Sequence, residues 1–168
     1  ISITYRVNDK TNYSANPGEY LYYEILFMNT GEDILQNLFL TVKLDESFVD
    51  FNSVRPENGN FQKSSGTILW DSNEVSELKF LPTMEEGRVR FWVKVKDKIE
   101  GSSPTIRADI SLSNVKGKIG TRINSRVNFV QRGYFTTGPF ENYGSQPPSV
   151  GSSTSYTVLW KMTNSNNE

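Results

Sequence analysis

The chain of 168 residues contains no Cys and no His, which excludes disulfides, thiolate metal sites, a Cys nucleophile and Ser-His-Asp catalysis. Its 18 basic and 19 acidic residues give a net charge of -1, so no long-range positive field favours nucleic-acid binding. Hydrophobic residues make up 36% of the chain, enough for a folded core. No apolar run reaches the roughly 18 residues that a membrane span needs.

Apolar and polar residues alternate with a period of two along most of the chain, between turn signals rich in Gly, Pro and Asn. This pattern is typical of half-buried β-strands, and no convincing apolar stripe of helical period accompanies it. The alternating segments in chain order are 1–7, 21–27, 38–44, 48–54, 68–70, 78–81, 89–95, 106–112 and 119–129. Their spacing predicts an all-β fold, an immunoglobulin-like antiparallel β-sandwich over residues 1–129.

The composition changes after residue 129. Residues 130–153 are rich in Gly, Pro and Ser and are interpreted as a linker or lead-in segment. Residues 154–168 contain a further alternating strand. At an offset of 133 residues (151 − 18), Gly151 aligns with Gly18 and Trp160 with Phe27. We interpret this strand as a β-strand extension belonging to a second, incomplete repeat; chance similarity between strands is the alternative.

Several motifs carry a family resemblance. The chain has Pro-Gly-Glu-Tyr-Leu-Tyr-Tyr-Glu-Ile at 17–25, Asn-Thr-Gly at 29–31, Ile-Leu-Trp-Asp at 68–71 and Val-Arg-Phe-Trp-Val at 89–93. Together, over about residues 14–96, they resemble a widespread surface repeat catalogued as the eleventh domain of unknown function. The resemblance implies an immunoglobulin-like sandwich in tandem arrays on bacterial or archaeal surfaces, including adhesins and S-layer-like coats. The family supplies no catalytic residues.

The resulting functional hypothesis is a non-enzymatic structural module, extracellular and at the cell surface, that serves as a spacer or building block of an array, filament or coat. Its expected partners are neighbouring repeats or copies of the same protein, without nucleic acid and without direct membrane insertion. The alternative is an adhesive binding module for a carbohydrate or protein ligand, and an accessory domain of a surface hydrolase ranks third.

Two sets of residues are candidate sites. Carboxylates in predicted loops could bind calcium, although no EF-hand spacing is present and solvated loop acids are the simpler interpretation; they are Asp45, Glu46, Asp50 and Asp71. No other cofactor is expected. Trp70 and Trp160 face inward by strand parity and are expected in a core. Interface candidates are aromatic or large apolar residues on the outward side of strands or near the Gly-Pro segment, and Trp160 is also included: Tyr20, Tyr22, Leu26, Met28, Trp92, Tyr143, Tyr156 and Trp160.

Overall fold

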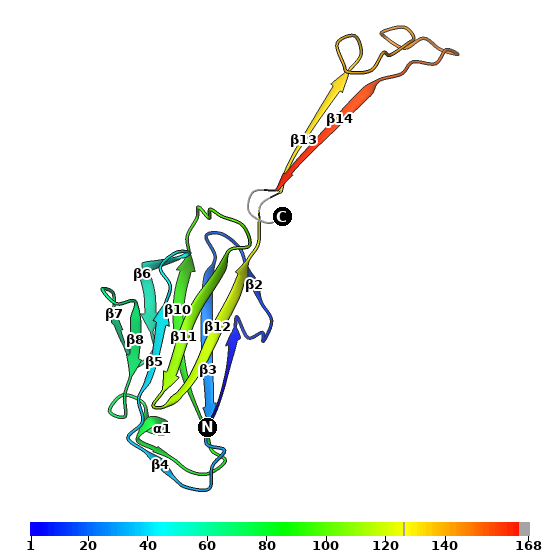
Figure 1. The fold of residues 1–168 in the computed structure, drawn as a ribbon. Coiled ribbons are helices and arrows are strands. Elements are labelled where there is room, and N and C mark those ends of the chain that lie inside the picture. The colour runs from blue at the N-terminus through cyan, green and yellow to red at the C-terminus, as the bar shows by residue number, and fades with distance from the viewer. Residues whose placement is uncertain (126, 165–168) are drawn as a thin grey trace. The chain divides into compact units, whose positions relative to one another are not determined.

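The computed structural model describes residues 1–125 and 127–164. The chain divides into two compact units, the first covering Ile1–Asn124 and the second beginning at Ser125. Figure 1 shows the strands of both units. Each unit has its own pattern of strand pairing and is treated separately below.

Unit 1 is a sandwich of two sheets, as the alternation predicts. Sheet A has the order β1-β3-β10-β6 and sheet B the order β2-β12-β11-β5-β8-β7. The strands of sheet A are β1 (Ser2–Val7), β3 (Tyr20–Met28), β10 (Glu86–Val95) and β6 (Val49–Pro56). Those of sheet B are β2 (Ser14–Ala15), β12 (Val115–Ile123), β11 (Thr105–Leu112), β5 (Leu40–Leu44), β8 (Thr67–Trp70) and β7 (Asn60–Gln62). Neighbouring strands are antiparallel except for β2, which pairs with β12 in parallel.

The core of unit 1 lies between the inner faces of the two sheets. Tyr23 stacks on Phe91 with ring centroids 4.8 Å apart, and both side chains are fully buried. The Tyr23 hydroxyl crosses to sheet B and donates a hydrogen bond to the Thr121 hydroxyl at 2.9 Å. Trp70 is also fully buried, as its strand parity predicts, and its Nε1 donates to the Glu57 carbonyl at 2.8 Å. Each buried polar group at these positions therefore has a partner.

One end of unit 1 carries shorter elements. A two-stranded ladder joins β4 (Leu35–Gln36) to β9 (Phe80–Leu81), next to a four-residue helix, α1 (Ser76–Lys79). The expected strand at 78–81 is therefore only partly confirmed, because Leu78 belongs to the helix. No helix of the described residues is long and apolar enough to span a membrane.

The expected final strand at 119–129 is two separate strands. β12 ends at Ile123, where the Asn124 N–H donates to the Ala15 carbonyl at 2.8 Å and closes the sandwich. Val127 and Phe129 belong instead to β13 (Val127–Tyr134), which pairs antiparallel with β14 (Thr157–Asn164) in unit 2. The sandwich thus ends at residue 124, and the first residues of the expected linker at 130–153 form part of a strand. The second-repeat interpretation of residues 154–168 stays a prediction, and residues 165–168 lie outside the described part.

Candidate interaction surfaces

The outer face of sheet A brings together three of the expected interface residues. Trp92 on β10 lies directly opposite Tyr22 on β3, and Tyr20 lies opposite Lys94. The rings of Tyr22 and Trp92 are 5.2 Å apart at the centroids, and Tyr20 and Trp92 keep 64% and 39% of their surface exposed. We call Tyr20, Tyr22 and Trp92 the aromatic platform. Leu26 and Met28 lie farther along the same face of β3 and are half-buried.

Ion pairs surround the aromatic platform and leave it nearly neutral. Arg90 Nε lies 3.1 Å from Glu24 Oε1, and Arg90 Nη1 lies 3.3 Å from Glu57 Oε2. Lys94 Nζ lies 3.1 Å from Asp97 Oδ2. Burial is the main cause that raises the pKa of Tyr22 above its ordinary value. An exposed aromatic surface of this kind is suited to contact with another molecule.

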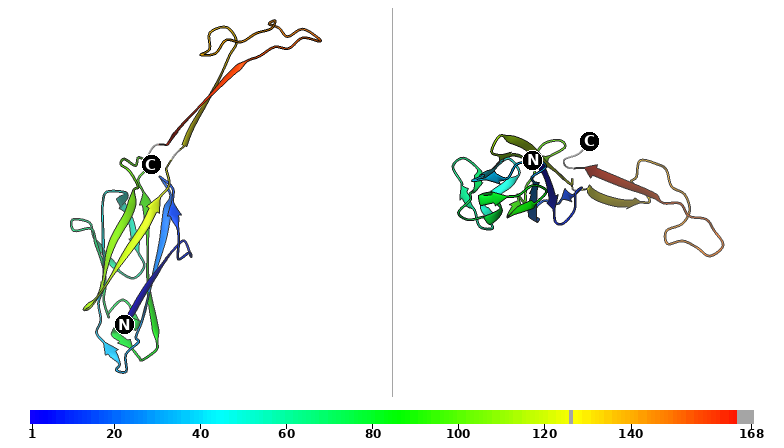
Figure 2. Two further views of the ribbon diagram at one scale, coloured as in Figure 1. Left: turned by 45° about the vertical axis from the view of Figure 1, so that its right-hand side comes forward. Right: turned by 90° about the horizontal axis from the view of Figure 1, so that it is seen from below.

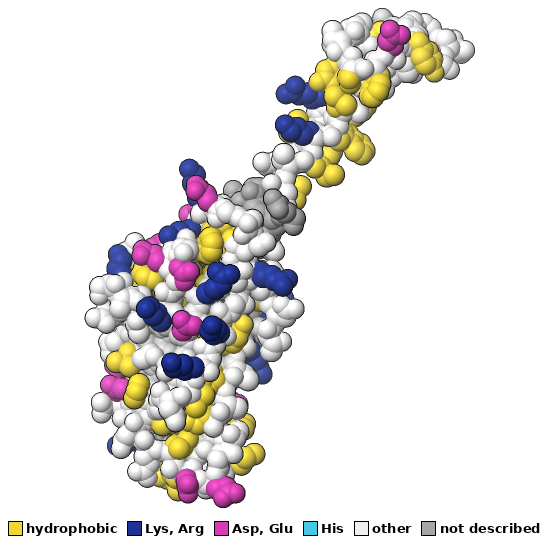
Figure 3. Space-filling model, viewed as in Figure 1, with side chains coloured by type: hydrophobic (Ala, Val, Ile, Leu, Met, Phe, Trp, Pro, Cys, Tyr) yellow, Lys and Arg dark blue, Asp and Glu magenta, His cyan; other side chains and the backbone are white. Residues whose placement is uncertain are grey.

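Unit 2 exposes a second apolar surface, on one side of the β13–β14 hairpin. In an antiparallel pair, directly opposite residues share a face, and the pairs here include Phe129↔Met162 and Gln131↔Trp160. The apolar members of this face are Val127, Phe129, Val158, Trp160 and Met162, all at least half exposed. We call these five residues the hairpin face; Figure 3 shows apolar side chains gathered along this hairpin. The expectation that Trp160 is buried in a core is wrong for the described residues, since it is 68% exposed.

The remaining interface candidates, Tyr143 and Tyr156, lie in or beside the 135–156 connection of the hairpin. Tyr143 is 66% exposed, and its backbone N–H donates to the Ser155 hydroxyl at 2.8 Å. Tyr156 is partly covered by Phe135, at 5.6 Å between ring centroids. These two tyrosines therefore belong to unit 2 and are not part of the aromatic platform.

The calcium candidates are not gathered into a site. Asp45 accepts hydrogen bonds from the Ser47 hydroxyl and backbone N–H, and these bonds lower the pKa of its carboxyl group, with a further contribution from Arg107 and Lys96. Asp50 and Asp71 likewise accept a backbone N–H two residues ahead, as local turns do. Among the described residues, no group of three or more acidic side chains is arranged to hold a metal ion.

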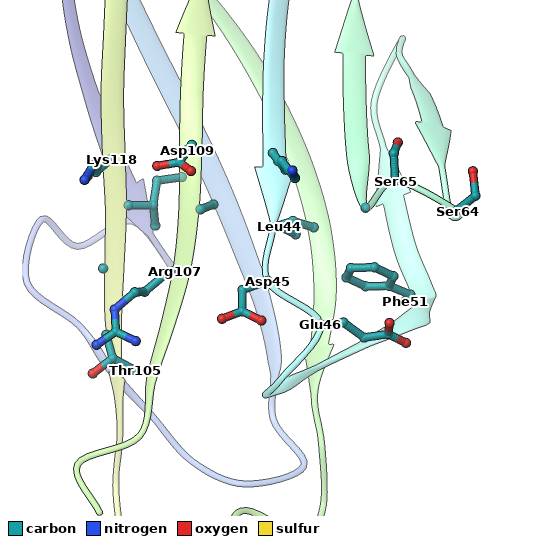
Figure 4. Close-up of a pocket in the computed structure, with 15 residues that line it drawn as sticks. Leu44, Asp45, Glu46, Phe51, Ser64, Ser65, Thr105, Arg107, Asp109 and Lys118 are labelled. Carbon is teal, nitrogen blue, oxygen red and sulfur yellow. The ribbon is translucent and has the colours of Figure 1, made fainter.

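Sequence reasoning missed a basic surface on the outer face of sheet B. Figure 3 shows Lys and Arg side chains over β5, β11 and β12, and Figure 4 shows several of them around an open depression of about 760 Å³. Its lining includes Lys43, Arg107, Asp109 and Lys118. The signal was the alternation Lys116, Lys118, Gly120, Arg122 on the outward side of β12; it is weak because exposed charges are ordinary on a solvated strand.

Comparison with known proteins gives distant structural likenesses only. No family model matches the chain, and no curated protein matches it by sequence, so the resemblance to the surface repeat stays a prediction. The chain is similar to the major pilin subunit of Bacillus cereus, with a TM-score of 0.48 and 12% identity over 98% of this chain and 56% of that one. It is also similar to two domains of the major pilin SpaD from Corynebacterium diphtheriae, with a TM-score of 0.43 and 14% identity over 83% of this chain and 58% of that one.

A third likeness concerns an uncharacterized Nocardia farcinica protein described as having an immunoglobulin-like fold, with a TM-score of 0.41 and 14% identity over 70% of this chain and 81% of that one. The chain thus spans a little over half the length of the two pilin chains. With TM-scores below 0.5 and identities of 12–14%, these likenesses carry no argument about ligands or assembly. The fold class predicted from the alternation is confirmed.

Proposed function

We propose that the chain is a non-enzymatic structural module of a prokaryotic cell-surface protein, in which the hairpin face docks against the sheet of a neighbouring module or copy. The observation that carries this proposal is that β13–β14, an antiparallel strand pair like β1–β3, has an exposed apolar side. In both pairs the second strand lies antiparallel to the first and follows a glycine-containing turn. Gly18 and Gly151, which precede β3 and β14 respectively, both adopt a left-handed backbone, with φ of 80° and 82°.

The two strand pairs differ in what covers them. In unit 1, Tyr23, Ile25 and Phe27 are fully buried, because sheet B packs on their side of β3. At the offset of 133 residues (151 − 18), their counterparts are Tyr156, Val158 and Trp160, which are 46%, 50% and 68% exposed. Among the described residues, therefore, no second sheet covers the apolar side of β13–β14.

The exposed hairpin face supplies a driving force for docking. A two-stranded hairpin alone is marginal in water, and burying each large apolar side chain contributes about 1.5–3 kcal/mol. Five such residues lie on one face of β13–β14. Covering them with another apolar sheet would stabilise the hairpin and join two modules at the same time.

The test is the oligomeric state of the full chain, measured by light scattering over a range of concentrations. We expect concentration-dependent association that is abolished by the double change Phe129→Ser and Trp160→Ser. The matched control is Val130→Ser with Leu159→Ser, which removes apolar side chains from the opposite side of the same hairpin and should leave association intact. A chain that stays monomeric at every concentration contradicts docking through this face.

The alternative function, an adhesive binding module, is favoured by the aromatic platform. Trp and Tyr are enriched at the energetic centres of interfaces, and Tyr22 and Trp92 contact each other on an exposed sheet face. Screening the full chain and its Trp92→Ala variant on glycan and protein arrays tests this role. A ligand bound by the parent chain and lost in the variant would support it, and an identical pattern would contradict it.

A further inference from the structure

The outward side of β12 carries a row of cations. Lys116, Lys118 and Arg122 are exposed at alternate positions, spaced by about 6.6 Å as in any strand. The gap in the row is Gly120, whose partner on β11 is Arg107. A Cβ at Gly120 would have only Thr105 within reach, at 4.0 Å, so the position is open and Arg107 can occupy it. We call Lys116, Lys118, Arg107 and Arg122 the basic stripe.

The cations of the basic stripe are not neutralised by ion pairs. Among residues 1–125 and 127–164, none of the four forms an ion pair or a side-chain hydrogen bond. On sheet A, by contrast, Arg90 pairs with Glu24 and Glu57 and Lys94 pairs with Asp97. The cations beside the aromatic platform, Arg90 and Lys94, are therefore paired, whereas the four cations of the basic stripe are not.

Nearby acids reduce this positive charge without cancelling it. Asp109 lies on β11 between two register partners, Lys118 on β12 and Lys43 on β5, so Lys43 balances it. Asp45 and Glu46 line the adjoining depression beside Arg107. Lys116 and Arg122 are not among the residues that line that depression, and the row along β12 keeps a net positive charge.

The residue types on the outer side of β11 and β12 favour one class of negatively charged polymer over others. No outward position of β11 or β12 carries a large apolar or aromatic side chain. The outward residues of β11 are Thr105, Arg107, Asp109 and Ser111, and those of β12 are Lys116, Lys118, Gly120 and Arg122. Protein interface cores are rich in aromatic residues and poor in Lys, and single-stranded nucleic acids are held by aromatic stacking. The net charge of -1 also disfavours a dense phosphate polymer. A hydrated, linear polymer with more widely spaced charges needs neither apolar nor stacking contacts.

We propose that the basic stripe binds an acidic polysaccharide, a linear glycan bearing carboxylates, laid along β12. Each carboxylate meets a Lys or Arg of the row, and the glycan hydroxyls stay in contact with water. Such binding rests on unit 1 alone and does not depend on docking through the hairpin face. It gives a surface module a means of holding an anionic coat polymer.

A competing explanation is that these charges only protect an edge strand. β12 is covered by β2 only at Arg122 and Ile123, and Lys on exposed edges prevents unwanted strand pairing. That role requires neither Arg107, which lies on an interior strand of sheet B, nor Arg122, where β2 already pairs. The experiment must therefore separate binding from aggregation.

The test measures the affinity of the full chain for polygalacturonate at low salt by titration calorimetry, with dextran as the neutral polymer and duplex DNA as the phosphate polymer. The test variant combines Lys116→Gln, Lys118→Gln and Arg122→Gln. The matched control combines Arg6→Gln, Arg88→Gln and Lys98→Gln, three exposed cations outside this face that also lack an ion pair among the described residues. Both variants change the net charge equally.

We expect the test variant to lose about a hundredfold in affinity, roughly fivefold for each cation, and the control to stay within about threefold. Asp109→Asn should tighten binding, and the dependence of log affinity on log salt should become shallower by up to about 1 for each stripe cation removed. Equal losses in the two triple variants, or equal binding of DNA, would overturn the proposal. The proposal would also be overturned if the test variant aggregated in light scattering while its monomer bound polygalacturonate with the affinity of the parent chain.

Discussion

At the scale of single residues, the centre of the sandwich depends on one polar group placed among aromatic rings. The Tyr23 ring stacks on Phe91 inside sheet A, while its hydroxyl reaches Thr121 of sheet B. The hydrogen bond fixes how the two sheets face each other, because neither hydroxyl can find water at this depth. Burial is the largest of the effects on the Tyr23 hydroxyl and raises its pKa well above the ordinary range.

This buried hydroxyl predicts a loss of stability at alkaline pH. The unfolded chain ionises Tyr near pH 10, and the folded chain does so only at higher pH, so the unfolded state binds fewer protons once the pH exceeds about 10. The free energy of unfolding should then fall by up to about 1.4 kcal/mol per pH unit for this group. We expect Tyr23→Phe to make that fall shallower, as measured by urea unfolding between pH 8 and pH 11 (about the range set by the reference value).

The control for this prediction is Thr121→Val, which removes the same hydrogen bond and keeps the Tyr23 hydroxyl. Both variants should lose about 1 kcal/mol at neutral pH, but only Tyr23→Phe should change the alkaline slope. Parallel slopes in the parent chain and Tyr23→Phe would show that burial of this hydroxyl does not govern the alkaline response.

At the scale of elements, the two sheets are joined on one side by a contact between edge strands. The Tyr5 hydroxyl on β1 donates to the Gly120 carbonyl at 3.3 Å and accepts from the Gly120 N–H at 3.2 Å. One side chain thereby binds both backbone groups of a single residue on β12. The contact closes the gap between β1 and β12 without a ladder of backbone hydrogen bonds.

Loss of this contact should loosen the edge of β12. We expect Tyr5→Phe to lower the free energy of unfolding by about 0.5–1.5 kcal/mol and to speed amide hydrogen exchange at Gly120. Tyr20→Phe is the control, because the Tyr20 hydroxyl makes no hydrogen bond among the described residues. Unchanged exchange at Gly120 in Tyr5→Phe would mean that the contact contributes nothing in solution.

The strands themselves show what a sequence pattern can and cannot predict. Alternation identified β10 and β11 well, because each is half-buried and most of its outward residues are polar, whereas β3 has apolar or aromatic residues on both faces. The same alternation placed Trp160 in a core and was wrong. A period of two tells which residues share a face, but not whether another sheet covers that face.

The candidate surfaces were predicted to different degrees for a related reason. Tyr22 and Trp92 could be assigned to outward positions from strand parity alone, but their contact depends on the register of β3 against β10, which a single sequence does not reveal. Predicting the basic stripe would require the pairing of β11 with β12 as well. Three of its cations alternate along β12, but Arg107 joins the row only because β11 places it opposite Gly120, so the complete stripe depends on how the strands pair.

At the scale of the whole molecule, the two units differ in how much apolar surface they bury. Unit 1 has a continuous core, whereas the residues of the hairpin face remain exposed. Strands with few buried contacts open at a low free energy. We expect amides of β3 and β10 to be the most protected in hydrogen exchange by mass spectrometry, and those of β13 and β14 to exchange much faster at low protein concentration.

A core substitution tests whether the units open separately. Phe91→Leu should lower protection across unit 1 by about 1–2 kcal/mol, since it removes a stacked and fully buried ring. The exchange of β13 and β14 should stay the same. A matching loss of protection in the hairpin would instead indicate one cooperative structure.

The N-terminus and the end of β12 lie at opposite ends of unit 1 (Figures 1 and 2), which determines how the module responds to tension. A pull between these points runs along the strands. It loads the β1–β3 pairs from Ser2↔Met28 to Val7↔Tyr23 in shear, so their hydrogen bonds must fail together and cannot be peeled apart one at a time. A module stretched in this way should hold a far larger force before rupture than the same hydrogen bonds would if unzipped from one end.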